Sequence, residues 1–220
     1  MLLSLLLLLL PPPLLLLLLF ARLQHVAMLK KRQQEATTAK NESKTLDDDA
    51  FFAIAAYTYH GFGVGAENQI YYALNRALRN RRVDKEPFEM WSGFLYHLER
   101  GLNLLDSVES VVFRGGNKGI DQATAKREYT VGRPIQWAAF SSTSLRREAA
   151  ANFATKGEGV LFVLKVRSGT AISHISMLGH EDEVLLSPNT RFTVTRDLYF
   201  DKHGVACVDM VETQPDVHVS

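Results

Sequence analysis

The stretch Val160-Leu161-Phe162-Val163-Leu164-Lys165-Val166 decides how this chain of 220 residues folds. Only Lys165 interrupts its apolar run, which is typical of a strand covered on both faces. The regions around it predict further strands over residues 110–113, 136–141, 183–186, 191–195 and 205–212. The sequence therefore places a β-sheet in the second half of the chain.

The part of the chain before residue 106 has helical patterning instead. Three helices are expected, the first opening at Asp47, the second over 67–81 and the third over 87–102, and a short fourth helix over 146–154 lies between strands. Asp47-Asp48-Asp49 caps the first helix, with apolar residues following on one face. Ile70, Leu74 and Leu78 recur every four residues in the second, and Ser144 can cap the fourth. Helices followed by strands predict an α+β fold.

Composition and charge exclude several classes of protein. Lys plus Arg is 25 and Asp plus Glu is 24, so a net charge of +1 argues against a nucleic-acid binder. A hydrophobic share of 46% argues against a disordered chain. Cys207 is the single cysteine, so an intrachain disulfide and a multi-cysteine zinc site are both excluded. The histidines show no tight ligand spacing, and no metal is expected.

Residues 1–20 differ from the rest because fourteen of them are leucine. Pro11-Pro12-Pro13 interrupts the run, whereas a transmembrane helix needs about 20 uninterrupted apolar residues. A secretory signal normally begins with basic residues, but the first one here is Arg22. The segment is a signal or membrane anchor, a leader without an export role, or an artefact of the coding sequence. Secretion or membrane association through residues 1–20 is favoured, with the cytoplasm as the alternative because of the single cysteine. After this segment we expect a linker over 21–45, one domain over 46–213 and a tail over 214–220.

Three local motifs could carry chemistry, and the first is an arginine. Arg114 follows a predicted strand and precedes Gly115 and Gly116. A guanidinium can bind two phosphate oxygens, and glycines let a ligand approach the backbone, so the motif suits a diphosphate. Taken alone, a surface arginine before a turn is the favoured interpretation.

The other two motifs are rich in hydroxyls and carboxylates. Hydroxyls of the run Phe140-Ser141-Ser142-Thr143-Ser144 can bind a sugar, orient a carboxylate or cap a helix. No Gly-x-Ser-x-Gly sequence surrounds these serines, so a hydrolase nucleophile is not expected. In an extended segment Glu181 and Glu183 point the same way. Such a pair can stabilise positive charge and handle a proton. Taken alone, an acidic turn before a strand is the favoured interpretation.

In this order along the chain, the three motifs resemble those of the arginine-specific mono-ADP-ribosyltransferases, the Arg/Ser/Glu-x-Glu class of vertebrate ecto-enzymes and bacterial toxins. The similarity extends to residues 70–79 and 183–188 and covers about 46–212. It implies the ADP-ribosyltransferase fold, with N-terminal helices packed on a split two-sheet β core. It also implies transfer of ADP-ribose from NAD, or from NADP, to an exposed arginine of an acceptor protein, with release of nicotinamide.

The resemblance assigns roles to single residues. It implies that Arg114 holds NAD phosphate, that Gly115 contacts the nicotinamide side through its backbone, and that Ser142 positions the nicotinamide ribose and the catalytic glutamate. Glu183 would be that glutamate. Glu181 would orient the acceptor guanidinium and help to deprotonate it.

Other positions are ambiguous or depart from the family. Phe153 would lie against nicotinamide, or would simply fill the core on its helix. Phe113 stands where the family often has tyrosine, and residues 175–180 lack the aromatic that many members use to recognise the target. An NAD glycohydrolase with water as acceptor and a non-catalytic NAD-binding module stay open as alternatives.

Overall fold

The computed structural model describes residues 46–59, 69–116, 120–154, 159–173, 175–176 and 182–213. These residues belong to two compact units, a helical unit within 1–106 and 174–179 and a strand unit within 107–173 and 180–220. Among the described residues, no helix is long and apolar enough to cross a membrane. The predicted leader, linker and tail over 1–20, 21–45 and 214–220 lie outside the described residues.

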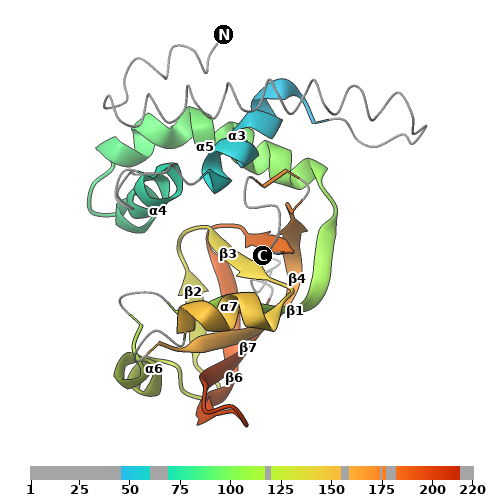
Figure 1. The fold of residues 1–220 in the computed structure, drawn as a ribbon. Helices are drawn as coiled ribbons and strands as arrows, with labels where there is room; N and C mark the ends of the chain where they lie inside the picture. The colour runs from blue at the N-terminus through green and yellow to red at the C-terminus, as the bar shows by residue number, and fades with distance from the viewer. Residues whose placement is uncertain are drawn as a thin grey trace, which may run out of the picture. The chain divides into compact units, whose positions relative to one another are not determined.

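The described part of the helical unit forms α3 (Asp48–Thr58), α4 (Ile70–Asn80) and α5 (Glu86–Leu104), which confirms the three predicted helices (Figure 1). The Asp47 carboxylate accepts a hydrogen bond from the Ala50 N–H at 2.9 Å, so α3 begins where the acidic run predicts. Ile70, Leu74 and Leu78 of α4 are all buried. The apolar spacing of α4 therefore marks its packed face.

Helix α3 is buried more completely than its sequence predicts. Every residue from Ala50 to Thr58 is buried, rather than one face alone. A Cβ atom added to Gly101 of α5 would lie 3.1 Å from the Ala50 carbonyl oxygen and 3.1 Å from Cδ1 of Ile54. The close packing of α5 on α3 therefore depends on the missing side chain of Gly101.

The strand unit follows the helices, which confirms the α+β fold. Its described elements are β1 (Ser107–Gly115), α6 (Gln122–Glu128), β2 (Pro134–Trp137), β3 (Ser141–Ser144), α7 (Arg147–Ala154), β4 (Leu161–Ala171), β5 (Glu183–Leu186), β6 (Thr190–Phe200) and β7 (Ala206–Glu212). The strands lie in the order β1-β3-β5-β4-β7-β6-β2, and β1 also pairs with β4. The β4–β7 pair is parallel, and the other pairs are antiparallel.

Strand β4 is the branch point of this sheet. One edge of β4 pairs with β1, whereas the other pairs with β7 over residues 161–165 and with β5 at Thr170 and Ala171. Strand β5 pairs with β3, and β3 returns to β1 where Phe113 lies opposite Ser144. The split expected in the β core thus takes the form of two branches, β5–β3 and β7–β6–β2, and the first branch closes a ring with β1 and β4.

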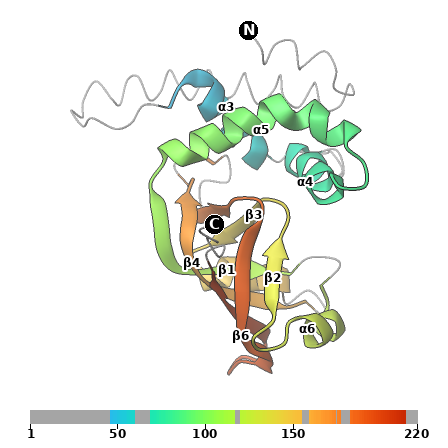
Figure 2. The same ribbon diagram turned by 180° about the vertical axis from the view of Figure 1, so that it is seen from behind.

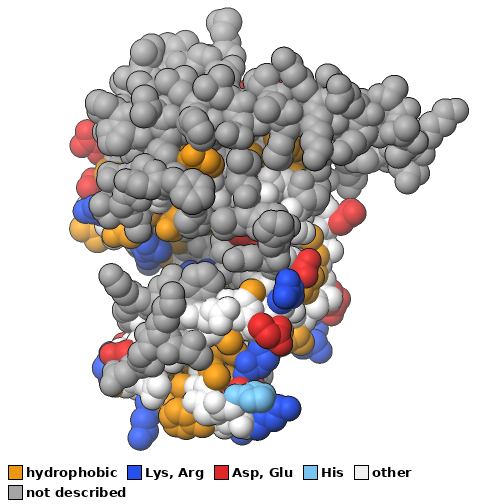
Figure 3. Space-filling model, viewed as in Figure 1, with side chains coloured by type: hydrophobic (Ala, Val, Ile, Leu, Met, Phe, Trp, Pro, Cys, Tyr) orange, Lys and Arg blue, Asp and Glu red, His pale blue; other side chains and the backbone are white. Residues whose placement is uncertain are grey.

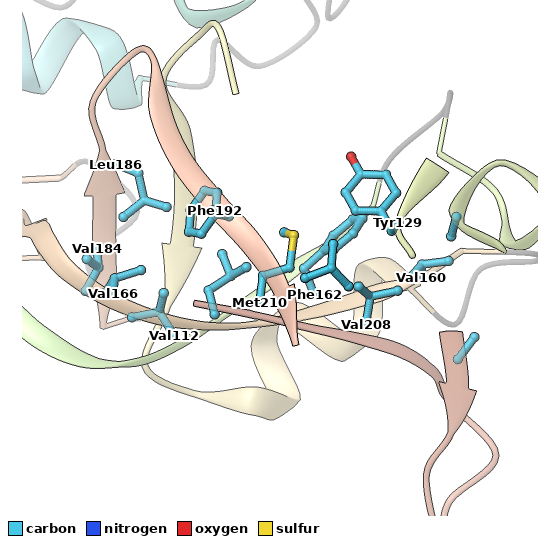
Figure 4. Close-up of a cluster of buried hydrophobic side chains, with 14 residues drawn as sticks. Val112, Tyr129, Val160, Phe162, Val166, Val184, Leu186, Phe192, Val208 and Met210 are labelled. Atoms are coloured by element: carbon cyan, nitrogen blue, oxygen red, sulfur yellow. The ribbon is translucent and has the colours of Figure 1, made fainter. Parts of the chain in front are cut away.

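The main hydrophobic core lies on one face of β4. Phe162, Leu164 and Val166 are buried there, with residues from β1, β5, β6 and β7 around them (Figure 4). On the opposite face Leu161 packs with Cys207 and with α7, which crosses that side of the strands (Figures 1 and 2). Further along that face Lys165 is exposed. The strand is therefore covered on both faces at its start and again at Gly169 and Thr170, and it is open on one face in between.

The predicted strand over 136–141 is wrong. Strand β2 ends at Trp137 and β3 begins at Ser141, because β2 pairs with β6 whereas β3 pairs with β5 in the other branch. Helix α6 was not predicted, although the Asp121 carboxylate caps it by accepting the Thr124 N–H at 2.7 Å. An aspartate followed by residues with good helix propensity was the available signal.

Candidate active site

Arg114 lies at the end of β1, one residue before the strand ends. Its side chain is half-buried, and its Nη1 donates a hydrogen bond to the carbonyl oxygen of Ser142 at 2.5 Å. These two residues are 28 positions apart in the chain. They meet because β3 lies beside β1 at Phe113 and Ser144. The tertiary structure thus brings the first two motifs together.

The register of β3 against β5 brings the second motif to the third. Ser144 lies opposite Glu183, and Ser142 lies opposite Leu185. Cross-strand partners share a face and alternate residues of a strand point the same way, so Ser142, Ser144 and Glu183 share one face. Ser142 and Glu183 are diagonal neighbours, about 7–8 Å apart, which a glutamate side chain can span.

Glu183 is a buried carboxylate at the start of a buried strand. Glu183 is 5% exposed, and its backbone carbonyl oxygen accepts a hydrogen bond from the Ile172 N–H at 3.0 Å. Burial strengthens the interaction of a carboxylate with a positive charge that forms nearby, because solvent screens the pair less. A carboxylate buried in this way can therefore stabilise a positive charge that develops beside it.

The hydroxyls of the serine motif divide between structural and exposed positions. Thr143 Oγ1 donates to the Val184 carbonyl oxygen at 2.6 Å, which ties β3 to β5. Ser144 Oγ accepts the Arg146 N–H at 2.9 Å at the head of α7, as the capping prediction requires. Ser142, in contrast, is exposed. Its hydroxyl is the one that a ligand can approach from solvent.

The two glycines after Arg114 have different surroundings. The Gly116 N–H donates to the Val160 carbonyl oxygen at 2.6 Å, and a Cβ on Gly116 would lie 3.0 Å from that oxygen. Gly116 therefore serves the close packing of the chain after β1 against β4. Gly115 is buried and lies opposite Leu161. Its contact with nicotinamide stays a prediction.

The backbone between the two motif glutamates is not extended. Asp182 has φ of +42°, in the left-handed region that aspartate tolerates better than most residues, and β5 begins at the next residue. The period-two argument assumes an extended backbone, which Asp182 interrupts, so the side on which Glu181 lies relative to Glu183 stays a prediction. Glu181 and the side chain of Phe153 lie outside the described residues. Their roles stay predictions.

Trp137 lies beside the site, although its place in the sequence predicts no role for it. The Cζ atom of Arg114 is 5.9 Å from the centroid of the Trp137 ring. A single aromatic at the end of a short strand carries no functional signal in the sequence. Only the approach of Arg114, near the end of β1, to Trp137 at the end of β2 reveals it.

The surface charges that Figure 3 shows on the strand unit do not form a large patch of one sign. On the described part of the strand unit in Figure 3, basic and acidic side chains are interspersed. Among the described residues, no group of three His, Cys, Asp or Glu side chains could hold a metal ion. The chemistry available at the site comes from a guanidinium, hydroxyls and a carboxylate.

Comparison with known families gives a match over most of the chain. The model for NAD:arginine ADP-ribosyltransferase matches residues 21–211. The matched range includes the predicted linker over residues 21–45. The domain start at residue 46 stays a prediction.

Similar proteins come from animals and bacteria. T-cell ecto-ADP-ribosyltransferase 1 of Mus musculus is 32% identical over 133 residues, which are 59% of this chain and 44% of that protein. The NAD(+)–protein-arginine ADP-ribosyltransferase Tre1 of Serratia proteamaculans is 31% identical over 153 residues, 69% of this chain and 30% of that protein. The chain thus spans less than half the length of either relative.

Solved structures share the fold at lower identity. The Vis toxin, an ADP-ribosyltransferase from Vibrio splendidus, has a TM-score of 0.62 at 17% identity and covers 88% of this chain and 87% of its own. The eukaryotic mono-ADP-ribosyltransferase ART2.2 has a TM-score of 0.57 at 22% identity, with 93% and 88% covered. These likenesses confirm the predicted fold.

Proposed function

The chain belongs to the NAD:arginine ADP-ribosyltransferase family, and on that premise we propose that it transfers ADP-ribose from NAD to arginine side chains of an acceptor protein, with release of nicotinamide. One observation carries the proposal beyond family membership. The Arg114–Ser142 hydrogen bond and the Ser144–Glu183 register gather the three motifs at one place in the strand unit.

Arg114 is proposed to bind the diphosphate of NAD. A guanidinium has five N–H donors in a planar fork, and the Ser142 carbonyl oxygen takes one of them. The same fork matches a pair of phosphate oxygens. The hydrogen bond to Ser142 links the phosphate-binding group to the strand that carries the ribose-binding hydroxyl. Arg114 and Ser142 then act by positioning NAD for reaction.

Glu183 is proposed to stabilise the reacting ribose. Cleavage of the nicotinamide–ribose bond develops oxocarbenium character at the ribose carbon, and nicotinamide leaves as a neutral molecule because it starts as a pyridinium. A carboxylate close to the developing charge binds the transition state better than the ground state. The burial of Glu183 supports this role, since a buried carboxylate acts through a lower effective dielectric.

The acceptor side of the reaction rests on the resemblance. We propose that Glu181 orients the acceptor guanidinium and helps to remove its proton, so that the arginine nitrogen attacks the ribose carbon. Gly115 and Phe153 are proposed to contact nicotinamide. The proposed catalytic domain covers residues 46–213, with NADP as a second substrate and no metal required.

The test is nicotinamide release from NAD by the purified chain, with and without agmatine as a small arginine mimic. The transferase predicts faster release with agmatine and an ADP-ribosyl-agmatine product of matching amount. Nicotinamide release at the same rate with and without agmatine identifies an NAD glycohydrolase instead. NAD binding without release identifies a non-catalytic module, and neither binding nor release by folded protein rejects the proposed site.

A further inference from the structure

An aromatic cluster lies under the guanidinium of Arg114. The Trp137 ring centroid is 5.9 Å from Cζ of Arg114, within the range of a cation–π contact. The Trp137 ring in turn packs edge-on against Phe162 at 5.6 Å and against Phe192 at 5.0 Å. Tyr129 completes the cluster, with its ring 5.0 Å from that of Phe162.

The position of Trp137 is set from both its backbone and its side chain. Trp137 lies opposite Thr190 in the β2–β6 pair, and its carbonyl oxygen accepts the Asn189 N–H at 2.8 Å. Tyr129 is buried and packs against Phe162, the same ring that Trp137 meets edge-on, and its burial raises the pKa of its hydroxyl. A ring held by this many neighbours has little freedom to turn.

We propose that Trp137 is a positioning residue for Arg114: its ring and the Ser142 carbonyl oxygen together hold the guanidinium in the orientation that meets the diphosphate of NAD. This inference rests on the proposed function. Arginine has several rotatable bonds, and two contacts from different strands reduce the conformations that binding must select among. The ring contact uses no N–H donor of Arg114, so it holds the guanidinium without competing with the phosphate oxygens for these donors.

The arrangement predicts a ranked effect on NAD binding. Trp137→Leu removes the ring and is expected to raise the KM for NAD about three- to tenfold, within the range of a cation–π contact. Trp137→Phe keeps a ring with a weaker quadrupole, so its KM for NAD is expected to lie between those of Trp137→Leu and the wild type. The kcat changes less than KM in both variants, because Arg114 binds NAD alike in the ground and transition states. A purely structural role predicts no such split, and the losses of activity then follow the losses of thermal stability.

A milder variant guards against a folding defect. Tyr129→Phe keeps the ring that packs against Phe162 and removes only the hydroxyl, so the KM for NAD is expected to change by less than about twofold. Thermal unfolding of all the variants accompanies the kinetics.

Fluorescence of Trp137 in the absence of NAD tests this inference separately from the proposed function. The chain has two tryptophans, Trp91 and Trp137, so a Trp91→Phe background leaves Trp137 as the single fluorophore. In that background Arg114→Met is expected to shift or brighten the Trp137 emission, because a cation leaves the ring. Arg114→Lys has a smaller effect, and Arg167→Met, at an exposed position on β4, has none.

Two results overturn the inference. One is Trp137 emission that does not change when Arg114→Met is introduced into the Trp91→Phe background. The other is an unchanged KM for NAD in Trp137→Leu while Arg114→Met raises it. If the wild-type chain neither binds nor cleaves NAD, the proposed function fails and the NAD part of the inference fails with it, whereas the emission response still decides whether Trp137 holds Arg114.

Discussion

Replacing Glu183 with glutamine tests the catalytic assignment most directly. The substitution keeps the size of the side chain and removes its charge. Because Glu183 is 5% exposed, the effective dielectric around its carboxylate is nearer 20 than 80. At about 4 Å from the reacting ribose carbon, the lost attraction is then about 4 kcal/mol, or about 10³-fold in rate. Glutamine retains a polar oxygen, so we expect kcat to fall about 10²- to 10³-fold.

The assay is the rate of nicotinamide release at saturating NAD with agmatine present. NAD affinity, measured by calorimetry, is expected to change less than about threefold, because the glutamate contributes mainly in the transition state. Asp182→Asn is the matched control, since it removes an exposed carboxylate one residue away and asparagine tolerates a positive φ. Solvent screening limits its effect to less than about fivefold.

A kcat for Glu183→Gln within about tenfold of the wild type, in folded protein that binds NAD, would refute the reasoning. Equal losses in Glu183→Gln and Asp182→Asn would also count against it. In that case the rate would depend on the total negative charge of the region rather than on one buried carboxylate.

Three further predictions concern specificity and stability. Glu181→Gln is expected to reduce transfer to agmatine more than hydrolysis of NAD, and equal losses of the two products would contradict its role at the acceptor. Gly169→Ala is expected to lower the free energy of unfolding by about 1–3 kcal/mol in urea titration, because the new Cβ would lie 2.6 Å from Cγ1 of buried Val184; wild-type stability would show that the core yields there. The Val205 N–H donates a hydrogen bond to Asp201 and lowers the pKa of this carboxyl below its ordinary value of 3.8. The ionised carboxylate therefore stabilises the fold above pH 3.8, and this stabilisation is lost as the pH falls below that value. The Tm of Asp201→Asn should therefore lie below that of the wild type at pH 7, with a gap that narrows below about pH 4, and a gap independent of pH would rule out the carboxylate as its cause.

Features with local causes were predictable from the sequence. The acidic residue before α3 caps that helix, the fourfold apolar spacing in α4 marks its buried face, and Ser144 caps the start of α7. Each depends on residues within about one helical turn. The order of the three motifs likewise predicted the family before any contact between them was known.

Features that depend on strand partners were not predictable. The sequence predicts one strand over 136–141, but this stretch splits into β2 and β3 because their partners lie in different branches of the sheet. Asp182 interrupts the extended backbone that the acidic motif suggested. Trp137 had no signal until β1 placed Arg114 over its ring.

The sequence by itself determined the type of most elements, the α+β order, the caps of α3 and α7 and the residue types of the candidate site, because these follow from neighbouring side chains. The tertiary structure alone decided that Arg114 meets Ser142, that Ser144 faces Glu183 and that Trp137 lies under the guanidinium. The physical reason is that strand pairing joins residues far apart in the chain, and its register is selected by the packing of the whole sheet. A one-residue slip of β3 against β5 would move the serine motif to the other face from Glu183.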